Sequence, residues 1–207
     1  MAPEVTPYNL TDAALFSGKG DGLLVWQPDD TYIVLGQSNT AEMSLISENV
    51  TADNITVTKR PTGGEAVVLT PHMAVITVAR EYNGMTGSKE FFKEVNTVIT
   101  EALAALGVRD LGTKGISDIT VGNRKILGSS MHRREGRLVY HAVLNLCENP
   151  IIFERYLRHP RREPDYRQKR SHSEFVTSLE REGYRVEFED FATILNTYSN
   201  SILPVGH

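Results

Sequence analysis

The feature that most constrains the fold is a long amphipathic segment near the middle of the chain. Between Lys89 and Leu106, apolar residues recur at three-to-four spacing, and Gly107 follows them. The apolar positions are Phe91, Val95, Val98, Ile99, Ala102, Leu103 and Leu106. This spacing predicts one helix with a single apolar stripe, and the glycine is typical of a helix end. A stripe of this length must be buried, and we expect it to face a β-sheet.

Strand-like segments on both sides of that helix can supply the sheet. We expect strands at residues 23–26, 31–35, 55–59, 66–69, 73–79, 118–121, 125–131 and 138–146. Residues 27–30 have a turn composition, which suggests that the first two strands form a hairpin. Turn-like residues also separate the last three strands, which we interpret as an antiparallel meander.

Further helices are expected at residues 9–17, 41–48, 151–158, 173–182 and 187–198. Strands therefore dominate the first three quarters of the chain and helices the last. This order predicts an α+β fold with a mixed, largely antiparallel sheet flanked by helices. With 207 residues, 40% of them hydrophobic, the chain is expected to form a single domain over residues 1–207.

Composition narrows the classes of function. A formal net charge of -4 disfavours a general nucleic-acid binder, which needs a basic face. Neither a signal peptide nor an apolar segment of about 20 residues is apparent, so we expect a soluble cytoplasmic protein that does not enter a membrane. The single cysteine, Cys147, excludes an internal disulfide and a metal site of several thiolates.

Two segments carry residues suited to binding an anionic ligand. Residues 59–67 place Arg60, Thr62, Gly63 and Gly64 between two expected strands. Paired glycines let a ligand approach backbone N–H groups, and an arginine can hold a carboxylate or phosphate. Taken alone, the same glycines are also typical of a plain hairpin turn.

The second segment, residues 117–130, places Lys125 just after a turn, with Gly128 in the same expected strand. A lysine held on a strand is a fixed charge for a carbonyl or phosphate oxygen, and a strand glycine often marks the close approach of a ligand. An edge-strand lysine beside a bulge is the alternative when this segment is taken by itself.

Together the two segments resemble the lipoate-protein ligase and octanoyltransferase family, whose catalytic domain is related to that of biotin ligases. Residues 60–67 are similar to the family's Arg-x-Ser/Thr-Gly-Gly-Gly-Ala-Val loop, and residues 118–130 to its Asn-Asp…Gly-Arg-Lys-Ile-x-Gly-Ser-Ala run. Order and spacing agree over roughly residues 9 to 146, and Val176-Thr177-Ser178-Leu179 resembles the start of a later family helix. The resemblance implies a biotin/lipoate ligase-like catalytic domain.

The resemblance also implies roles for particular residues. Lys125 would be the catalytic lysine that contacts the acyl carbonyl and the α-phosphate, and Asp118 would lie on the nucleotide side with it. The lipoyl-AMP pocket would be lined by Arg60, Thr62, Gly63, Gly64, Ala66, Gly128, Ser129 and His141. The implied reaction forms lipoyl-AMP from lipoate and ATP, with Mg²⁺ accompanying the ATP, and then modifies a carrier lysine. We assign no protein metal ligand, and Asp118 is only a candidate.

Three departures from the family's pattern keep two other readings open. Glu65 replaces the third glycine of the loop, Leu69 replaces a histidine, and Cys147 matches no nucleophilic cysteine of the family's transferases. The alternatives are an octanoyl or lipoyl transferase that uses Cys147, and a non-enzymatic subunit that binds lipoylated carriers.

A basic stretch, residues 155–170, contains Arg158, Arg161, Arg162, Arg167, Lys169 and Arg170. It is either a solvated loop or a docking surface for an acidic carrier. The partners implied are a lipoyl carrier domain or an H-protein-like acceptor. Because the family's ligases carry a C-terminal accessory domain that we do not find in this sequence, a separate accessory subunit is a further expected partner.

Overall fold

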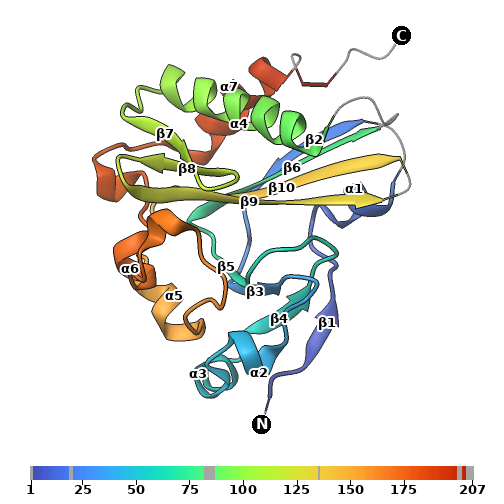
Figure 1. Ribbon diagram of the computed structural model, residues 1–207, viewed down its shortest axis with the longest axis vertical. Coiled ribbons are helices and arrows are strands. Elements are labelled where there is room, and N and C mark those ends of the chain that lie inside the picture. The colour runs from blue at the N-terminus through green and yellow to red at the C-terminus, as the bar shows by residue number, and fades with distance from the viewer. Residues whose placement is uncertain (1, 19–20, 82–86, 135, 200–201, 204–207) are drawn as a thin grey trace.

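The computed structural model describes residues 2–18, 21–81, 87–134, 136–199 and 202–203, and Figure 1 shows their arrangement. Within these residues lie a six-stranded sheet of order β2-β6-β10-β9-β8-β7 and a four-stranded sheet of order β1-β4-β3-β5. The larger sheet contains β2 (Gly22–Trp26), β6 (Met73–Glu81), β7 (Leu111–Lys114), β8 (Asp118–Val121), β9 (Arg124–Arg134) and β10 (Arg137–Asn145). The smaller contains β1 (Val5–Pro7), β3 (Tyr32–Leu35), β4 (Thr56–Lys59) and β5 (Val67–Leu69).

One face of the larger sheet is covered by α4 (Ser88–Ala105) and α7 (Phe188–Tyr198) (Figure 1). The predicted stripe is confirmed, because Phe91, Val95, Ile99 and Leu103 are fully buried in the core on this face. The meander is confirmed too, since β8, β9 and β10 pair as antiparallel neighbours.

Alternation along β10 divides its side chains between two environments. Tyr140, Ala142 and Leu144 belong to the core beneath α4. Successive side chains of a strand point to opposite faces. His141 and Val143 accordingly lie on the face turned away from α4, toward the smaller sheet.

The predicted hairpin between the first two strands is wrong. β2 pairs with β6, whereas β3 pairs in parallel with β4 and antiparallel with β5. Ile33, Val34 and Leu35 of β3 are all at most 1% exposed, so this strand is buried on both faces. A strand of that kind is stable in the middle of a sheet with two hydrogen-bonded neighbours, and the turn composition of residues 27–30 cannot reveal this.

The shorter helices are α1 (Ala13–Ser17), α2 (Ala41–Ser44), α3 (Ser47–Ala52), α5 (Ile151–Tyr156) and α6 (His172–Phe175), with 3-10 turns η1 (Asp165–Arg167) and η2 (Glu180–Glu182). The helix predicted at residues 41–48 is broken where Leu45 pairs with Leu157. The helix predicted at residues 173–182 is also wrong, because α6 ends at Phe175 and Val176 pairs with Lys125 of β9. The sequence patterns gave no indication of β1 or β7.

The fold class is nevertheless the predicted one, an α+β arrangement around mixed, largely antiparallel sheets. No helix in the described part of the chain is both long enough and apolar enough to cross a membrane.

Candidate active site

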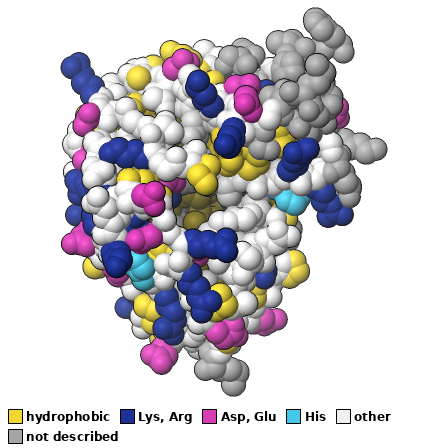
Figure 2. Space-filling view, in the orientation of Figure 1, with side chains coloured by type: hydrophobic (Ala, Val, Ile, Leu, Met, Phe, Trp, Pro, Cys, Tyr) yellow, Lys and Arg dark blue, Asp and Glu magenta, His cyan; other side chains and the backbone are white. Residues whose placement is uncertain are grey.

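A cavity of about 490 Å³ lies where β9 and β10 face residues 60–68 and the α5–α6 region. Figure 2 shows a hollow near the centre of this face, with hydrophobic side chains in it and Lys and Arg side chains around it. Apolar lining residues are Met43, Val68, Met73, Val143, Phe153, Leu157, Phe175 and Val176. The site therefore offers an apolar surface beside several cations.

Lys125 is held in this pocket by an ion pair and by backbone contacts. Its Nζ lies 2.8 Å from Oδ1 of Asp118, and the two side chains are 26% and 13% exposed. The N–H of Thr177 donates to the Lys125 carbonyl at 2.9 Å, which ties the strand to the segment after α6. The β8–β9 register shifts between Ile119 and Thr120, directly opposite this position. Such bulges often redirect a side chain beside an active site.

Gly128 makes room for the lysine. A Cβ atom at this position would lie 2.5 Å from the Lys125 Nζ and 2.6 Å from its Cε. The lysine side chain therefore lies directly over the glycine. This contact explains why the residue three positions after the lysine has no side chain.

Arg60 organises the loop between β4 and β5. The residue is 4% exposed, and its Nε donates to Thr62 Oγ1 at 2.6 Å. Its Nη2 donates to the carbonyls of Gly63 and Glu65, at 2.9 and 3.0 Å. Burial lowers the pKa of Arg60 to about 10, which leaves it charged at neutral pH. These bonds show that Arg60 shapes the loop in addition to lining the pocket.

Thr62 joins the same loop to the larger sheet. It is fully buried, and its Oγ1 accepts from Ser130 Oγ of β9 at 2.9 Å. Gly64 has a φ of +89°, the left-handed conformation that glycine adopts easily, and it lies in the pocket wall. The hydrogen bond between Thr62 and Ser130 thus fixes the loop against β9.

The structure brings most of the predicted site residues to one cavity. Its lining includes Arg60, Gly64, Ala66, Lys125, Gly128, Ser129 and His141. Three predicted residues do not line it: Thr62 is buried below the loop, Gly63 accepts from Arg60, and Asp118 reaches the pocket only through Lys125. The ligand contacts expected of all these residues stay predictions.

The departures at Glu65 and Leu69 fall in different surroundings. Glu65 lines the pocket, where its Oε2 accepts from Asn39 Nδ2 at 3.3 Å. Leu69 is fully buried among Trp26, Val34 and Val75, between the two sheets. The leucine is therefore a core residue and does not face the pocket.

His141 is oriented by a buried carboxylate that the sequence did not reveal. It is 3% exposed, and its Nε2 lies 3.3 Å from Oδ2 of the fully buried Asp12. Tyr8 also donates to Asp12 at 2.6 Å, and Thr77 donates to it from β6. Burial alone would raise the pKa of Asp12, but the hydrogen bond and charge of His141, with the Thr77 and Tyr8 bonds, lower it.

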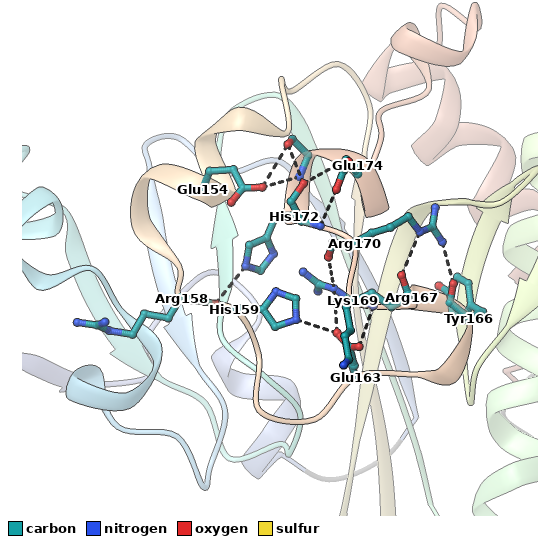
Figure 3. A network of polar contacts seen from close by, with 12 residues as sticks. Glu154, Arg158, His159, Glu163, Tyr166, Arg167, Lys169, Arg170, His172 and Glu174 are labelled. Carbon is teal, nitrogen blue, oxygen red and sulfur yellow. Dashed lines mark hydrogen bonds and ion pairs between the residues drawn. The ribbon is translucent and has the colours of Figure 1, made fainter.

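The basic stretch borders the pocket, a position that its sequence did not indicate. Lining residues from this region and from α6 are Arg158, His159, Arg161, Arg162, Arg167 and His172. Figure 3 shows Glu163 among them, accepting from His159 Nε2 at 2.8 Å. The exposed Arg161 and Arg162 remain available at the surface. Several cations therefore surround the site that Lys125 occupies.

Cys147 lies outside this cavity. The residue is exposed, and its amide N–H donates to the carbonyl of His72. Partial burial and the nearby Glu180, Glu148 and Glu187 raise the pKa of the thiol. A raised pKa disfavours the thiolate that nucleophilic acyl transfer requires.

The described residues do not fit a protein-held metal ion. They contain no group of three or more His, Cys, Asp or Glu side chains that could hold one. Asp118, the candidate, already uses Oδ1 for Lys125 and Oδ2 for Tyr166. We therefore assign no residue to Mg²⁺.

Known proteins resemble this chain in sequence and in structure. Lipoate-protein ligase A of Psychrobacter cryohalolentis is 28% identical over 140 residues, which are 67% of this chain and 39% of that protein. The chain thus spans about two fifths of the length of this curated relative. A lipoate-protein ligase A solved with ATP superposes with a TM-score of 0.79 at 19% identity, covering 98% of this chain and 86% of the other.

A second solved structure is a bi-partite lipoate protein ligase from Thermoplasma acidophilum, described with its E2 lipoyl domain. It has a TM-score of 0.78 at 17% identity and covers 100% of this chain and 85% of its own. At these identities the structures establish the shared fold. The sequence model of the lipoyl protein ligase A/B catalytic domain matches residues 9–198, and the chain therefore belongs to this family.

Proposed function

We propose that this protein is a lipoate-protein ligase, which forms lipoyl-AMP from lipoate and ATP and transfers the lipoyl group to a lysine of a carrier protein. One observation carries the proposal. Lys125 is held by Asp118 over Gly128, inside a pocket that combines an apolar wall with surrounding cations. The solved lipoate-protein ligase A with bound ATP, and a solved lipoate protein ligase homologue from T. acidophilum with bound lipoic acid, support the same pair of substrates.

The pocket suits an acyl adenylate in both size and polarity. A volume of about 490 Å³ lies within the usual range for small-molecule sites. The apolar side chains of Val143, Phe153 and Leu157 offer a surface for a hydrocarbon chain. Lys125 and the arginines of the basic stretch offer positive charge for carboxylate and phosphate oxygens.

The proposed reaction has two steps. First, a carboxylate oxygen of lipoate attacks the α-phosphorus of ATP, and the bond to the β-phosphate breaks, which releases pyrophosphate. Next, the unprotonated amine of the acceptor lysine attacks the acyl carbonyl. The bond between the carbonyl carbon and the phosphate oxygen breaks, AMP leaves, and the amine proton passes to solvent. Lys125 stabilises the negative charge that develops on the carbonyl and phosphate oxygens.

Cys147 favours the ligase over a cysteine-dependent transferase. Its thiol lies outside the pocket lining, and its pKa is raised. A thioester route would need this thiol as a thiolate beside the acyl carbonyl. Cys147→Ser is therefore expected to retain full transfer activity, and a loss of activity would instead support the transferase.

The acceptor that we propose is a small carrier domain with an acidic surface around its lysine. Arg161 and Arg162 are exposed where they border the pocket, so an acidic carrier would be attracted toward the reacting end of the adenylate. A separate accessory subunit that assists adenylate formation is part of the proposal, and the bi-partite relative supports it.

The test is an intact-mass measurement on a lipoyl carrier domain incubated with the purified protein. One reaction contains ATP, Mg²⁺ and lipoate, and the other contains preformed lipoyl-AMP. We expect the carrier to gain the mass of a lipoyl group in the reaction with lipoyl-AMP. It should gain the same mass with ATP and lipoate if the protein forms the adenylate without an accessory subunit. A carrier that stays unmodified in both reactions would contradict the proposal and favour a non-enzymatic carrier-binding role. Lys125→Ala should abolish the mass gain, with an unchanged circular dichroism spectrum.

A further inference from the structure

One carboxylate links Lys125 to the basic stretch. Asp118 binds the Lys125 Nζ through Oδ1 at 2.8 Å and accepts from the phenol of Tyr166 through Oδ2 at 2.8 Å. Tyr166 belongs to η1, within the basic stretch of residues 155–170. The two contacts use both oxygens of the same side chain, so Asp118 lies between the tyrosine and the lysine.

The tyrosine is itself firmly placed. Its ring centroid lies 5.0 Å from that of Phe175 in α6. On the other side, a Cβ atom at Gly115 would lie 3.4 Å from Tyr166 Cε1, which indicates close packing against the β7–β8 turn. Burial, together with the charge of Asp118 and the hydrogen bond to it, raises the pKa of Tyr166. The phenol therefore keeps its proton and can donate it to the carboxylate at neutral pH.

Arg170 fixes the backbone at Tyr166 and at the residue that follows it. Its Nη2 donates to the Tyr166 carbonyl at 2.8 Å and its Nε to the Arg167 carbonyl at 3.0 Å, as Figure 3 shows. Its Nη1 donates to the carbonyl of Asn123, in the β8–β9 turn, at 3.1 Å. One arginine thus joins the basic stretch to the hairpin that carries both Asp118 and Lys125.

An unusual backbone conformation accompanies these bonds. Gln168 and Lys169 have φ values of 53° and 59°, the left-handed region that residues other than glycine rarely adopt. The surrounding contacts must hold such residues in place, and they occur often at functional sites. Glu163 supplies one of these contacts by accepting from the Lys169 N–H at 3.0 Å.

We propose that Tyr166 is a positioning residue, which fixes the Asp118 carboxylate so that the Lys125 ammonium is directed over Gly128 into the pocket. Without the phenol, Oδ2 would exchange its fixed donor for mobile water, and the carboxylate could rotate about its side chain. The lysine would then sample several positions. The effect on acyl transfer rests on the proposed function, whereas the effect on the lysine itself does not.

The first experiment measures the reactivity of Lys125 and needs no enzymatic activity. Tyr166→Phe and the wild-type protein are labelled briefly with an amine-acylating reagent, and the modification of each lysine is quantified by peptide mass spectrometry. Lys59, whose Nζ donates to the Asn39 carbonyl at 3.0 Å, serves as the internal reference. We expect labelling of Lys125 relative to Lys59 to rise about threefold, because its ion pair is less firmly held.

Tyr32→Phe is the matched control for this change. It also removes a hydrogen bond from a tyrosine to an aspartate, Tyr32 to Asp29 at 2.7 Å, but outside the pocket lining. It should leave the Lys125 labelling ratio unchanged. A ratio that is equal in Tyr166→Phe and the wild type would overturn the positioning role, whether or not the protein transfers lipoate.

The second experiment asks whether Tyr166 acts through Asp118. Single-turnover transfer from lipoyl-AMP is measured for Tyr166→Phe, Asp118→Asn and the double variant. We expect Tyr166→Phe to slow transfer about tenfold in the wild type but less than about twofold in the Asp118→Asn background. Equal effects in both backgrounds would show that the tyrosine acts independently of the carboxylate. No transfer by the wild type would count against the proposed function, and the labelling result would then decide the positioning role.

Discussion

The absence of a side chain at Gly128 leaves room for Lys125. The Lys125 side chain passes over the Gly128 Cα, so any added carbon would meet the end of the lysine. The atoms in conflict are the flexible end of the lysine and not the backbone. The lysine can therefore move aside without disrupting the sheet, which separates the effect on activity from the effect on folding.

We predict that Gly128→Ala lowers acyl transfer at least tenfold, because small displacements of a catalytic group reduce the rate strongly. Its free energy of unfolding should change by no more than about 1 kcal/mol. Single-turnover transfer and urea denaturation measure the two quantities. Gly112→Ala, in β7 of the same sheet, is the control, since its Cβ would meet only Thr120 Oγ1, at 3.2 Å. Wild-type activity in Gly128→Ala would contradict the proposed contact between Lys125 and its substrate.

Asp12 gives a prediction on the pH dependence of stability. Its pKa is lowered in the folded protein, so the carboxylate stabilises the fold above its unfolded pKa, and this contribution is lost as pH falls through the folded pKa. Asp12→Asn should reduce the free energy of unfolding at pH 7 by an amount on the order of 1–3 kcal/mol. The difference from wild type should shrink below about pH 4. Urea denaturation at several pH values tests this, and a difference independent of pH would refute it.

At the scale of elements, the loop from Arg60 to Ala66 depends on contacts from both sheets. Arg60 Nη1 donates to the Val34 carbonyl in β3 at 3.2 Å, and Thr62 Oγ1 accepts a hydrogen bond from the Ser130 hydroxyl in β9. The loop therefore forms pocket wall and also connects the two sheets. Its geometry is set by hydrogen bonds between buried and half-buried groups.

Replacing Thr62 with valine tests this connection. The change nearly preserves the shape of the side chain but removes the acceptor for both the Arg60 Nε and the Ser130 hydroxyl. We expect the free energy of unfolding to fall by on the order of 1–3 kcal/mol, because a buried charged donor is left unpaired. Chemical denaturation measures the loss. Ser130→Ala removes only a donor and should cost less, and the reverse order would contradict this account of the loop.

At the scale of the whole molecule, charge is unevenly distributed. The chain has a formal net charge of -4, yet arginines gather beside the pocket. An acidic carrier would therefore be repelled by the molecule as a whole and attracted at the entrance to the site. Such steering affects the rate of encounter and weakens as salt screens the charges.

Reversing the charge at Arg161 and Arg162 together should lower kcat/KM for carrier lipoylation and make it less sensitive to salt. Arg185→Glu is the control, because its side chain is 88% exposed and it lies outside the pocket lining. The measurement is kcat/KM over a range of NaCl concentrations. An equal loss from the Arg185 variant would indicate a general charge effect in place of docking at the pocket.

Much of this molecule could be predicted from short stretches of sequence. The α4 stripe follows from periodicity, because each residue's exposure depends there on neighbours within a few positions. Lys125, Gly64 and Gly128 could be selected because their types and order form a recognisable pattern. Asp12 could not, because within a short helical segment nothing distinguishes a buried acidic residue from one exposed to solvent.

Most of the strands, the long helix and the reactive residue types follow from sequence patterns, since helix periodicity, strand propensity and the conformational freedom of glycine are local properties. Only the tertiary structure decided which strands pair and what surrounds the lysine. Tyr166 is 48 residues from Asp118 along the chain, yet its hydroxyl lies 2.8 Å from that carboxylate. Contacts of this kind depend on how the sheets and loops pack together, and no local pattern encodes them. For this reason the basic stretch of residues 155–170, expected to be a solvated loop or a docking surface, also forms part of the pocket wall.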